Sequence, residues 1–236
     1  MSNSDVLRAG YSPMISSDAL VIGISMRRIQ ASGYIDPREA MSTDWFRCVQ
    51  DLFPQAVILP IPNIKECVSA LLARVNFNGM ILSNGNDIGS EPERDETERI
   101  ILNHCLEHEI PLIGVCRGFH FILNEFGVPL CEKVEGHVNE QHQVSLVDNF
   151  FQKQELASHK SVNSFHRQGV LLESLKGPLK PLAKSSDGLL EGFYHQSKPL
   201  IAIQWHVERP HQDEDFSKTL LKDLFLKGCF WNKKEK

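Results

Sequence analysis

The sequence lacks the features that define several special classes of protein. No run of apolar residues approaches the roughly 20 that a membrane-spanning helix needs. The first residues, Met1 to Asp5, offer no basic region of the kind that opens a secretory signal peptide. The net charge of −5 lacks the positive excess of a general nucleic-acid binder. We therefore expect a cytoplasmic protein that binds neither nucleic acid nor membrane.

Closely spaced cysteine pairs are also absent. The six cysteines are scattered, and none belongs to a C-x-x-C motif. This spacing disfavours a zinc or redox site and suits a reducing compartment. His137 and His142 lie near each other, but the carboxylates and spacing around them fit a metal site poorly, so we expect no metal and no cofactor. Five cysteines are interpreted as small buried residues, whereas the context of Cys116 indicates chemistry.

The pattern of apolar residues predicts an α/β fold. Residues 1–18 are polar and aperiodic and are expected to form an N-terminal arm, followed by a single domain at 19–236. In the first part of the domain, strands are expected at Ala19–Ser25, Ala56–Leu59, Gly79–Leu82 and Pro111–Val115. Helices are expected between and after them, at Asp36–Phe53, Lys65–Arg74, Arg94–His108 and Gly118–Phe126. Apolar strands without strict alternation are typical of a parallel sheet that is covered on both faces.

The second half of the chain is less regular. Strands are expected at Val144–Val147, Gly169–Leu172, Gly188–His195 and Leu200–Gln204. A closing helix is expected at Ser217–Phe225, where apolar residues again follow a helical period.

A candidate nucleophile lies at the end of a predicted strand. Gly114 and Gly118 flank Cys116 at two residues on either side, and a predicted helix follows. This is the arrangement of a nucleophile elbow with cysteine in place of serine. Small neighbours allow the chain to turn sharply, and the helix N-terminus would favour a thiolate and a developing oxyanion. A buried cysteine on a glycine-rich turn is the simpler alternative.

A candidate base lies at the end of a second predicted strand. A thiol nucleophile usually needs a histidine, which in turn needs an orienting group. His206 ends the apolar segment that begins at Ile201, and Glu208 follows two positions later. Residues two apart at a strand end point to the same side, so Glu208 can hold one imidazole nitrogen while the other faces Cys116. Taken alone, the pair could equally be a surface histidine and glutamate.

Several motifs together resemble the class I glutamine amidotransferase fold, and within it the γ-glutamyl hydrolase branch. In chain order they are Leu82-Ser-Asn-Gly-Asn-Asp87, Arg94-Asp-Glu-Thr-Glu98, Gly114-Val-Cys-Arg-Gly118, Val162-Asn-Ser-Phe-His-Arg-Gln168, Asp187-Gly-Leu-Leu-Glu191 and Gln204-Trp-His-Val-Glu208. The resemblance covers roughly residues 21–208. It implies a flavodoxin-like three-layer sandwich with a mostly parallel central sheet.

The resemblance also implies a role for each motif. Cys116 would attack a γ-glutamyl carbonyl, His206 would transfer the proton, and Glu208 would orient His206. The backbone N–H groups of Gly85 and Arg117 would hold the oxyanion. Substrate-binding roles would fall to Asn84, His120, Asn163, Ser164, His166 and Arg167.

Three positions depart from the pattern of the branch. Asn84 precedes Gly85 where a second glycine is usual, and Val207 replaces the usual proline before Glu208. His120 stands where a glutamine commonly helps to hold the glutamyl group. The last change affects substrate recognition more than the nucleophile.

The residues leave two uses of this chemistry open. One is a hydrolase that acts alone, and the other is a glutaminase that supplies ammonia to a separate synthetase partner. The segments Gly23–Arg28 and Ser42–Phe46 resemble the hydrolases of γ-glutamyl nucleotide phosphoramidates in capsule synthesis, which implies γ-glutamyl-CDP-amidate as substrate. Four arginines are candidates for binding its diphosphate: Arg27, Arg28, Arg117 and Arg167. A homodimer and a catalytically silent binding protein are further alternatives.

Overall fold

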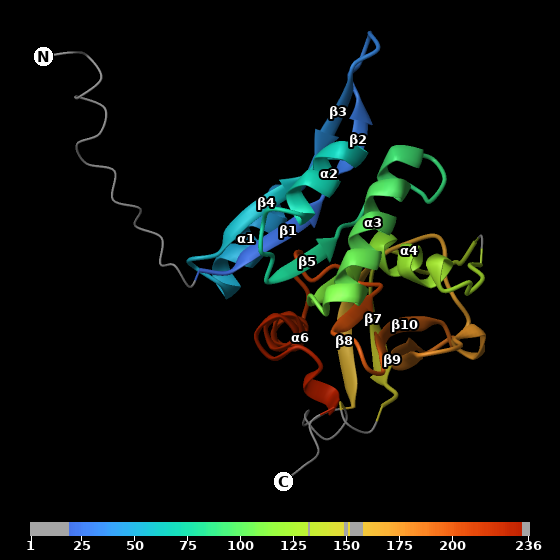
Figure 1. Cartoon of the computed structure of the whole chain (residues 1–236). Helices are drawn as coiled ribbons and strands as arrows, with labels where there is room; N and C mark the ends of the chain where they lie inside the picture. The colour runs from blue at the N-terminus through green and yellow to red at the C-terminus, as the bar shows by residue number, and fades with distance from the viewer. Residues whose placement is uncertain (1–18, 132, 149–150, 152–157, 233–236) are drawn as a thin grey trace, which may run out of the picture.

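A mixed sheet of nine strands forms the centre of the protein. The structure is a computed structural model, shown in Figure 1, that describes residues 19–131, 133–148, 151 and 158–232. The predicted arm at 1–18 lies outside these residues. Neighbouring strands in one half of the sheet run parallel, in the order β4 (Val57–Ile61), β1 (Val21–Ser25), β5 (Gly79–Leu82), β6 (Leu112–Val115) and β11 (Leu200–Ile203). The other half is antiparallel and continues from β11 with β10 (Leu190–His195), β9 (Leu179–Ser185), β7 (Val138–Leu146) and β8 (His159–Phe165).

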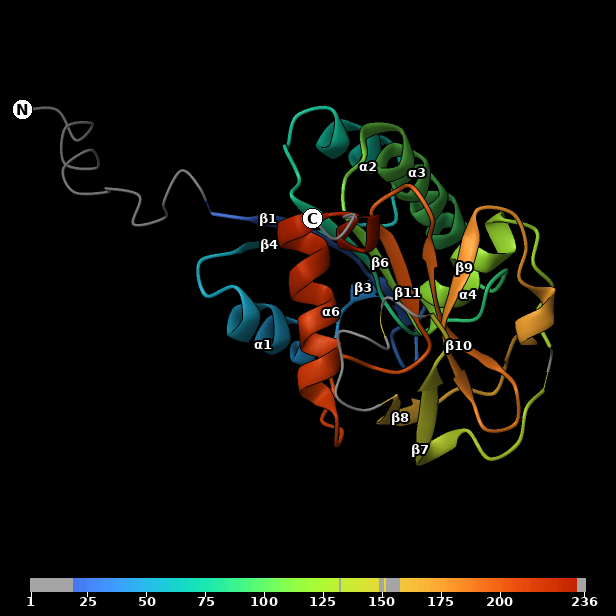
Figure 2. The same cartoon turned by 90° about the horizontal axis from the view of Figure 1, so that it is seen from below.

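Helices cover both faces of the parallel half (Figure 2). One face packs against α1 (Thr43–Leu52) and α6 (Glu214–Lys227), and the other against α2 (Lys65–Leu72), α3 (Pro92–His108) and α4 (Arg117–Glu125). Alternate strand residues divide between the two cores, with Ile113 in the first and Leu112 in the second. The α/β class and its three layers are therefore confirmed.

The predicted helix at 36–53 was wrong in its first turns. Pro37–Ala40 form strand β3, which pairs antiparallel with β2 (Arg27–Gln30). Helix α1 begins at Thr43 because the Ser42 side chain accepts a hydrogen bond from the backbone N–H of Asp44 and caps it.

The strands of the second half differ from the prediction in three ways. Gly169–Leu172 is no strand, because it pairs only through two isolated bridges and runs into the 3₁₀ helix η1 (Leu172–Ser174). Strands β8 and β9 were not predicted, and β7 begins at residue 138 rather than 144. Their alternating apolar pattern is weak because many of their side chains are polar. A second 3₁₀ helix, η2 (Phe230–Asn232), closes the described chain.

The sheet order positions the predicted site. Strands β5, β6 and β11 are adjacent and parallel, so their carboxyl ends lie at one edge of the sheet. The segments that follow them contain Gly85, Cys116 and His206. Within the described part of the chain, no helix is long and apolar enough to span a membrane.

Candidate active site

The backbone at Cys116 is held in an unusual conformation between β6 and α4. Its φ of 54° and ψ of −98° lie in a region that non-glycine residues rarely occupy. The Cys116 N–H donates a hydrogen bond to the carbonyl oxygen of Ile203 at 2.9 Å, which ties the turn to the end of β11. Strain held in this way by the surrounding structure is typical of a nucleophile elbow.

The two flanking glycines are required by close packing. A Cβ atom on Gly118 would lie 2.2 Å from the carbonyl oxygen of Leu82, and one on Gly114 would lie 2.7 Å from that of Gly118. Both obstacles are backbone atoms, which cannot move aside as a flexible side chain could. The glycines therefore allow α4 to approach β5, which brings Cys116 close to the segment after β5.

His206 and Glu208 form a buried pair beside this turn. Nδ1 of His206 lies 2.7 Å from Oε1 of Glu208, and the Glu208 side chain is fully buried. Asn163 fixes the backbone of His206, since its amide accepts from the His206 N–H at 2.8 Å and donates to the His206 carbonyl at 2.9 Å. Glu208 thus holds one imidazole nitrogen of His206, and Asn163 holds its backbone.

The electrostatics of this pair favour a charged imidazole. Burial lowers the pKa of His206, but its hydrogen bonds and charge interactions with Cys116 and Glu208 outweigh burial and raise that pKa to about 9. The Nε2 atom of His206 forms no hydrogen bond of normal geometry with a described residue. Cys116 is nevertheless close enough to raise the pKa of His206. Contacts between nucleophile and base are often loose until substrate binds.

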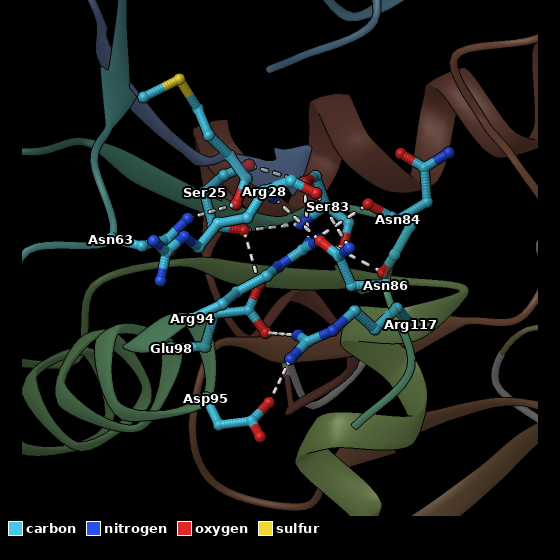
Figure 3. A network of polar contacts seen from close by, with 12 residues as sticks. Ser25, Arg28, Asn63, Ser83, Asn84, Asn86, Arg94, Asp95, Glu98 and Arg117 are labelled. Atoms are coloured by element: carbon cyan, nitrogen blue, oxygen red, sulfur yellow. Dashed lines mark hydrogen bonds and ion pairs between the residues drawn. The ribbon is translucent and has the colours of Figure 1, made fainter. Parts of the chain in front are cut away.

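The candidate oxyanion loop follows β5 and is held by one buried arginine (Figure 3). Gly85 has a φ of +91°, which favours glycine. Arg94 is fully buried and donates to the carbonyl oxygens of Ser83 at 2.8 Å, Asn84 at 3.2 Å and Gly85 at 3.1 Å. These carbonyls are thereby turned toward Arg94. As the first residue of α4, Arg117 has a backbone N–H with no acceptor within the helix, as a second oxyanion donor requires.

A carboxylate links this loop to the nucleophile turn. Glu98 accepts from Arg94 at 3.0 Å and from the Ser25 hydroxyl at 2.8 Å, and it also pairs with the side chain of Arg117 (Figure 3). Arg117 pairs with Asp95 as well. From the sequence, residues 94–98 were identified only as the acidic first turns of a helix. Its ion pairs could not be predicted, because they depend on how α3 and α4 pack.

A cavity of about 510 Å³ contains the candidate nucleophile and base. Its lining brings together residues from both halves of the sheet: Arg27, Asn84, Gly85, Cys116, Arg117, His120, Val138, Phe165, His166, Arg167, Gln168, His206 and Arg209 among others. This volume lies in the range of small-molecule sites.

The predicted substrate residues divide into two groups. Asn84, His120, His166 and Arg167 line the cavity, whereas Asn163 and Ser164 do not. The Asn84 side chain also donates to Glu208 Oε1 at 3.2 Å and lies 3.1 Å from His206 Nδ1, so it supports the base. The Ser164 hydroxyl donates to the carbonyl of His137 at 2.8 Å. His120 is neutral at pH 7, because burial, aided by His166, lowers its pKa to about 3.

The four candidate arginines differ in their availability to a ligand. Arg27 and Arg167 are exposed and line the cavity. Arg28 pairs with Glu93 at 2.6 Å, and the guanidinium of Arg117 is held by carboxylates. Arg209, which the sequence analysis missed, lines the cavity and lies 4.6 Å from the centre of the Phe165 ring. Arg209 directly follows Glu208 in the sequence, and this position next to the predicted triad could have identified it.

The parallel sheet and the elbow define the class I glutamine amidotransferase fold. A glutamine amidotransferase of Thermotoga maritima superposes with a TM-score of 0.59 over 87% of this chain and 96% of its own, at 16% identity. The peptidase C26 family model matches residues 20–208, and the chain belongs to that family.

Curated relatives narrow the comparison further. The chain is 32% identical over 197 residues to a γ-glutamyl-CDP-amidate hydrolase of Campylobacter jejuni subsp. jejuni serotype O:2, covering 80% of this chain and 90% of the relative. It is 28% identical to γ-glutamyl-γ-aminobutyrate hydrolase PuuD of Escherichia coli K12, over 62% and 64% of the two chains. A glutamine-hydrolysing GMP synthase subunit of Thermococcus kodakarensis is 28% identical over 71% and 84%. The family to which the chain belongs thus includes hydrolases of γ-glutamyl amides.

Proposed function

We propose that the protein is a cysteine hydrolase that cleaves a γ-glutamyl amide through a glutamyl thioester. The observation that carries this proposal is the meeting of Cys116, His206 and the Gly85 loop in one cavity. An elbow cysteine beside a carboxylate-bound histidine supplies a nucleophile and a proton carrier together.

The proposed reaction has two stages. The Cys116 thiolate attacks the γ-carbonyl carbon, and the N–H groups of Gly85 and Arg117 stabilise the oxyanion. As the intermediate collapses, the C–N bond breaks and His206 gives its proton to the leaving nitrogen. Water then attacks the thioester and loses a proton to His206. The C–S bond breaks, and glutamate leaves with Cys116 restored.

The leading substrate is γ-glutamyl-CDP-amidate, which would yield glutamate and cytidine diphosphoramidate for modification of capsule polysaccharide. The similarity to the Campylobacter jejuni hydrolase supports this choice. So does the charge of the cavity, since Arg27 and Arg167 line it and a diphosphate is anionic. Arg209 also lines the cavity, where it lies 3.6 Å from Glu208. The alternative of a glutaminase with a synthetase partner is supported by the similarity to the GMP synthase of Thermococcus kodakarensis.

A substrate profile distinguishes these proposals. The purified protein is incubated separately with γ-glutamyl-CDP-amidate, γ-glutamyl-γ-aminobutyrate and glutamine, and released glutamate is measured. We expect the highest kcat/KM for the nucleotide substrate. Rapid glutamine turnover without action on the nucleotide would favour the glutaminase. Turnover of γ-glutamyl-γ-aminobutyrate alone would keep the reaction class and replace the substrate.

Reaction with a glutamine-like electrophile tests the nucleophile independently of the leaving group. Cys116 should be labelled selectively. Burial raises the pKa of the Cys48 thiol to about 12 and also raises that of Cys105, so neither should react. Cys67 is exposed, contrary to the expectation from sequence, and serves as the internal control for nonspecific labelling. Equal labelling of Cys67 and Cys116 would count against an activated nucleophile.

A further inference from the structure

Three histidines and a glutamate gather in the antiparallel half of the sheet. His137 directly precedes β7, His142 lies in β7, His166 follows β8, and Glu191 lies in β10. Nitrogen atoms of His137 and His166 and an oxygen of Glu191 all lie within 4.8 Å of one another. His137 and His166 are each 4% exposed and Glu191 is fully buried. Polar groups this well buried normally have hydrogen-bond partners.

The tautomers of His137 and His166 follow from the contacts of the ring nitrogens that point away from Glu191. Nε2 of His137 lies 3.1 Å from Oδ2 of Asp187, so this nitrogen carries the proton. Nδ1 of His166 donates to the carbonyl oxygen of Gln168 at 2.8 Å. A neutral imidazole with one nitrogen protonated presents a lone pair on the other. Nδ1 of His137 and Nε2 of His166 therefore present lone pairs on the side of Glu191.

The atoms that meet at the centre of the cluster are all hydrogen-bond acceptors, namely two histidine nitrogens and a carboxylate oxygen. Oε1 of Glu191 lies 3.7 Å from His137 Nδ1 and 3.5 Å from His166 Nε2. These atoms, together with Oε2, form no hydrogen bond with any described residue. The separations exceed the usual 2.7–3.2 Å of an N–H···O bond. The histidines lie within ion-pair distance of Glu191 but do not donate a normal hydrogen bond to it. A buried carboxylate without a hydrogen bond is costly, and a bound cation would offset that cost.

The spacing fits a tetrahedral metal site. Zinc binds imidazole nitrogen and carboxylate oxygen at about 2.0–2.2 Å, so two ligand atoms of one tetrahedral ion lie roughly 3.3–3.5 Å apart. The contacts between Glu191 and the two histidines come close to this separation. Histidines that bind a metal through one nitrogen commonly donate their other N–H to a carboxylate or a backbone carbonyl. His137 Nε2 and His166 Nδ1 make these contacts, with Asp187 and with the carbonyl of Gln168.

We propose that the protein binds one divalent transition-metal ion, foremost Zn²⁺, through Nδ1 of His137, Nε2 of His166 and Oε1 of Glu191. His142 positions the glutamate, because its Nε2 lies 3.5 Å from Oε2 of Glu191. Three protein ligands leave a fourth position for water or an anionic oxygen. Since His166 also lines the cavity that contains Cys116, the ion lies beside the substrate cavity. This proposal differs from the expectation from sequence that the protein binds no metal.

Metal binding is measured directly, without reference to turnover. The full chain, free of any histidine tag, carries Cys116→Ser and His104→Gln, and zinc is quantified by calorimetry and by elemental analysis. The first substitution prevents binding at the thiol. The second breaks the pair formed by the half-buried His104 and the exposed His108, whose ring centroids are 4.3 Å apart. We expect one zinc per chain and, with Co²⁺, the absorption spectrum of a four-coordinate ion without thiolate ligands.

Variants of the cluster assign the ligands. His137→Gln and Glu191→Gln should each lower zinc affinity by at least a hundredfold, and Asp187→Asn by about 10- to 100-fold because it only orients His137. His195→Gln, a buried histidine outside the cluster, should not change affinity. The milder Asp187→Asn keeps the test valid if a ligand variant fails to fold. Absence of binding by Zn²⁺, Co²⁺, Ni²⁺ and Mn²⁺, or ligand variants that bind like the parent, would overturn the proposal.

Discussion

The two halves of the central sheet contribute to the candidate site in different ways. In the parallel half, the loop after β5, the turn after β6 and the segment after β11 bring reactive groups to adjacent strand ends. Their positions are set by backbone geometry, as the strained φ of Cys116 and the positive φ of Gly85 indicate. In the antiparallel half, the chain contributes side chains that form the wall of the cavity, including Phe165, His166 and Arg167.

This difference suggests a division of labour. Under the proposed function, the groups fixed by the backbone would act on the γ-glutamyl carbonyl, which every γ-glutamyl amide shares. The side chains of the antiparallel wall would contact the leaving group, which differs between substrates. Substitutions of the backbone-fixed groups, such as Cys116, should therefore reduce turnover of all substrates alike. Substitutions in the antiparallel wall should change the ratio between substrates.

The largest effect is expected for Cys116→Ser. Loss of the thiolate should lower kcat by at least about 10⁴-fold for each of the three γ-glutamyl substrates. The side chains are close in size, so the melting temperature should stay within a few degrees. Cys67→Ser, an exposed position outside the cavity, is the matched control and should keep full activity. Substrate-selective loss in Cys116→Ser would contradict a shared nucleophile.

Glu208→Gln should have the next largest effect and should also alter the pH profile. Without the carboxylate, His206 loses both a raising influence on its pKa and its orienting partner. We expect kcat/KM to fall by about 10²–10³-fold for all substrates.

The sign of the pH effect follows from the raised pKa of His206. Because this pKa is about 9, the imidazolium that protonates the leaving nitrogen persists up to that pH, and activity should fall above it. In Glu208→Gln the pKa decreases, so the alkaline limb should move to lower pH. Rates measured from pH 5 to 10 check this, and an unchanged alkaline limb would exclude His206 as the titrating group.

Sequence patterns predicted the parallel half better than the antiparallel half. Runs such as Leu112–Val115 are buried on both faces, which makes them readable as strands without any partner being known. Strand β8 contains the polar residues His159, Lys160 and Asn163, which interrupt the apolar pattern of a strand. Local propensity carries little information in such a strand.

The same limit applies to the candidate site. Cys116, His206 and Glu208 lie in short local motifs, and the motifs predicted their grouping. The link from Arg94 through Glu98 to Arg117 joins two helices and a loop, and spacing alone gives no sign of it. The closeness of Glu191 to His137 and His166 was missed for a similar reason, because the two histidines flank other strands.

Replacement of Arg94 tests how far stability depends on the parallel half. Arg94→Met leaves the buried Glu98 with fewer partners and removes the donors to three loop carbonyls. We expect the free energy of unfolding to fall by about 3–5 kcal/mol, as for other broken buried pairs. Urea denaturation measures this as a lower midpoint with an unchanged slope.

The matched control lies on the same helix. Arg99 is 42% exposed on its side chain and pairs with Glu125 at 2.9 Å, so Arg99→Met should cost no more than about 1 kcal/mol. An equal loss of unfolding free energy in the two variants would mean that the buried Arg94 network stabilises the fold no more than an exposed ion pair does.

The smallest effect and the sharpest contrast between the halves are expected for Arg167→Gln. Arg167 is an exposed side chain in the antiparallel wall of the cavity. If it contacts the diphosphate, KM for γ-glutamyl-CDP-amidate should rise about tenfold, which corresponds to ~1.4 kcal/mol. KM for γ-glutamyl-γ-aminobutyrate and kcat for both substrates should stay within twofold, because neither depends on the diphosphate contact.

Arg74→Gln removes the same charge from an exposed position outside the cavity and should leave both KM values unchanged. Since the two variants share one net charge, a rise in KM that is confined to Arg167→Gln reports a local contact rather than long-range attraction. An equal rise for both substrates in Arg167→Gln would place this arginine at the glutamyl group. The division between a catalytic parallel half and a selective antiparallel wall would then fail at this residue.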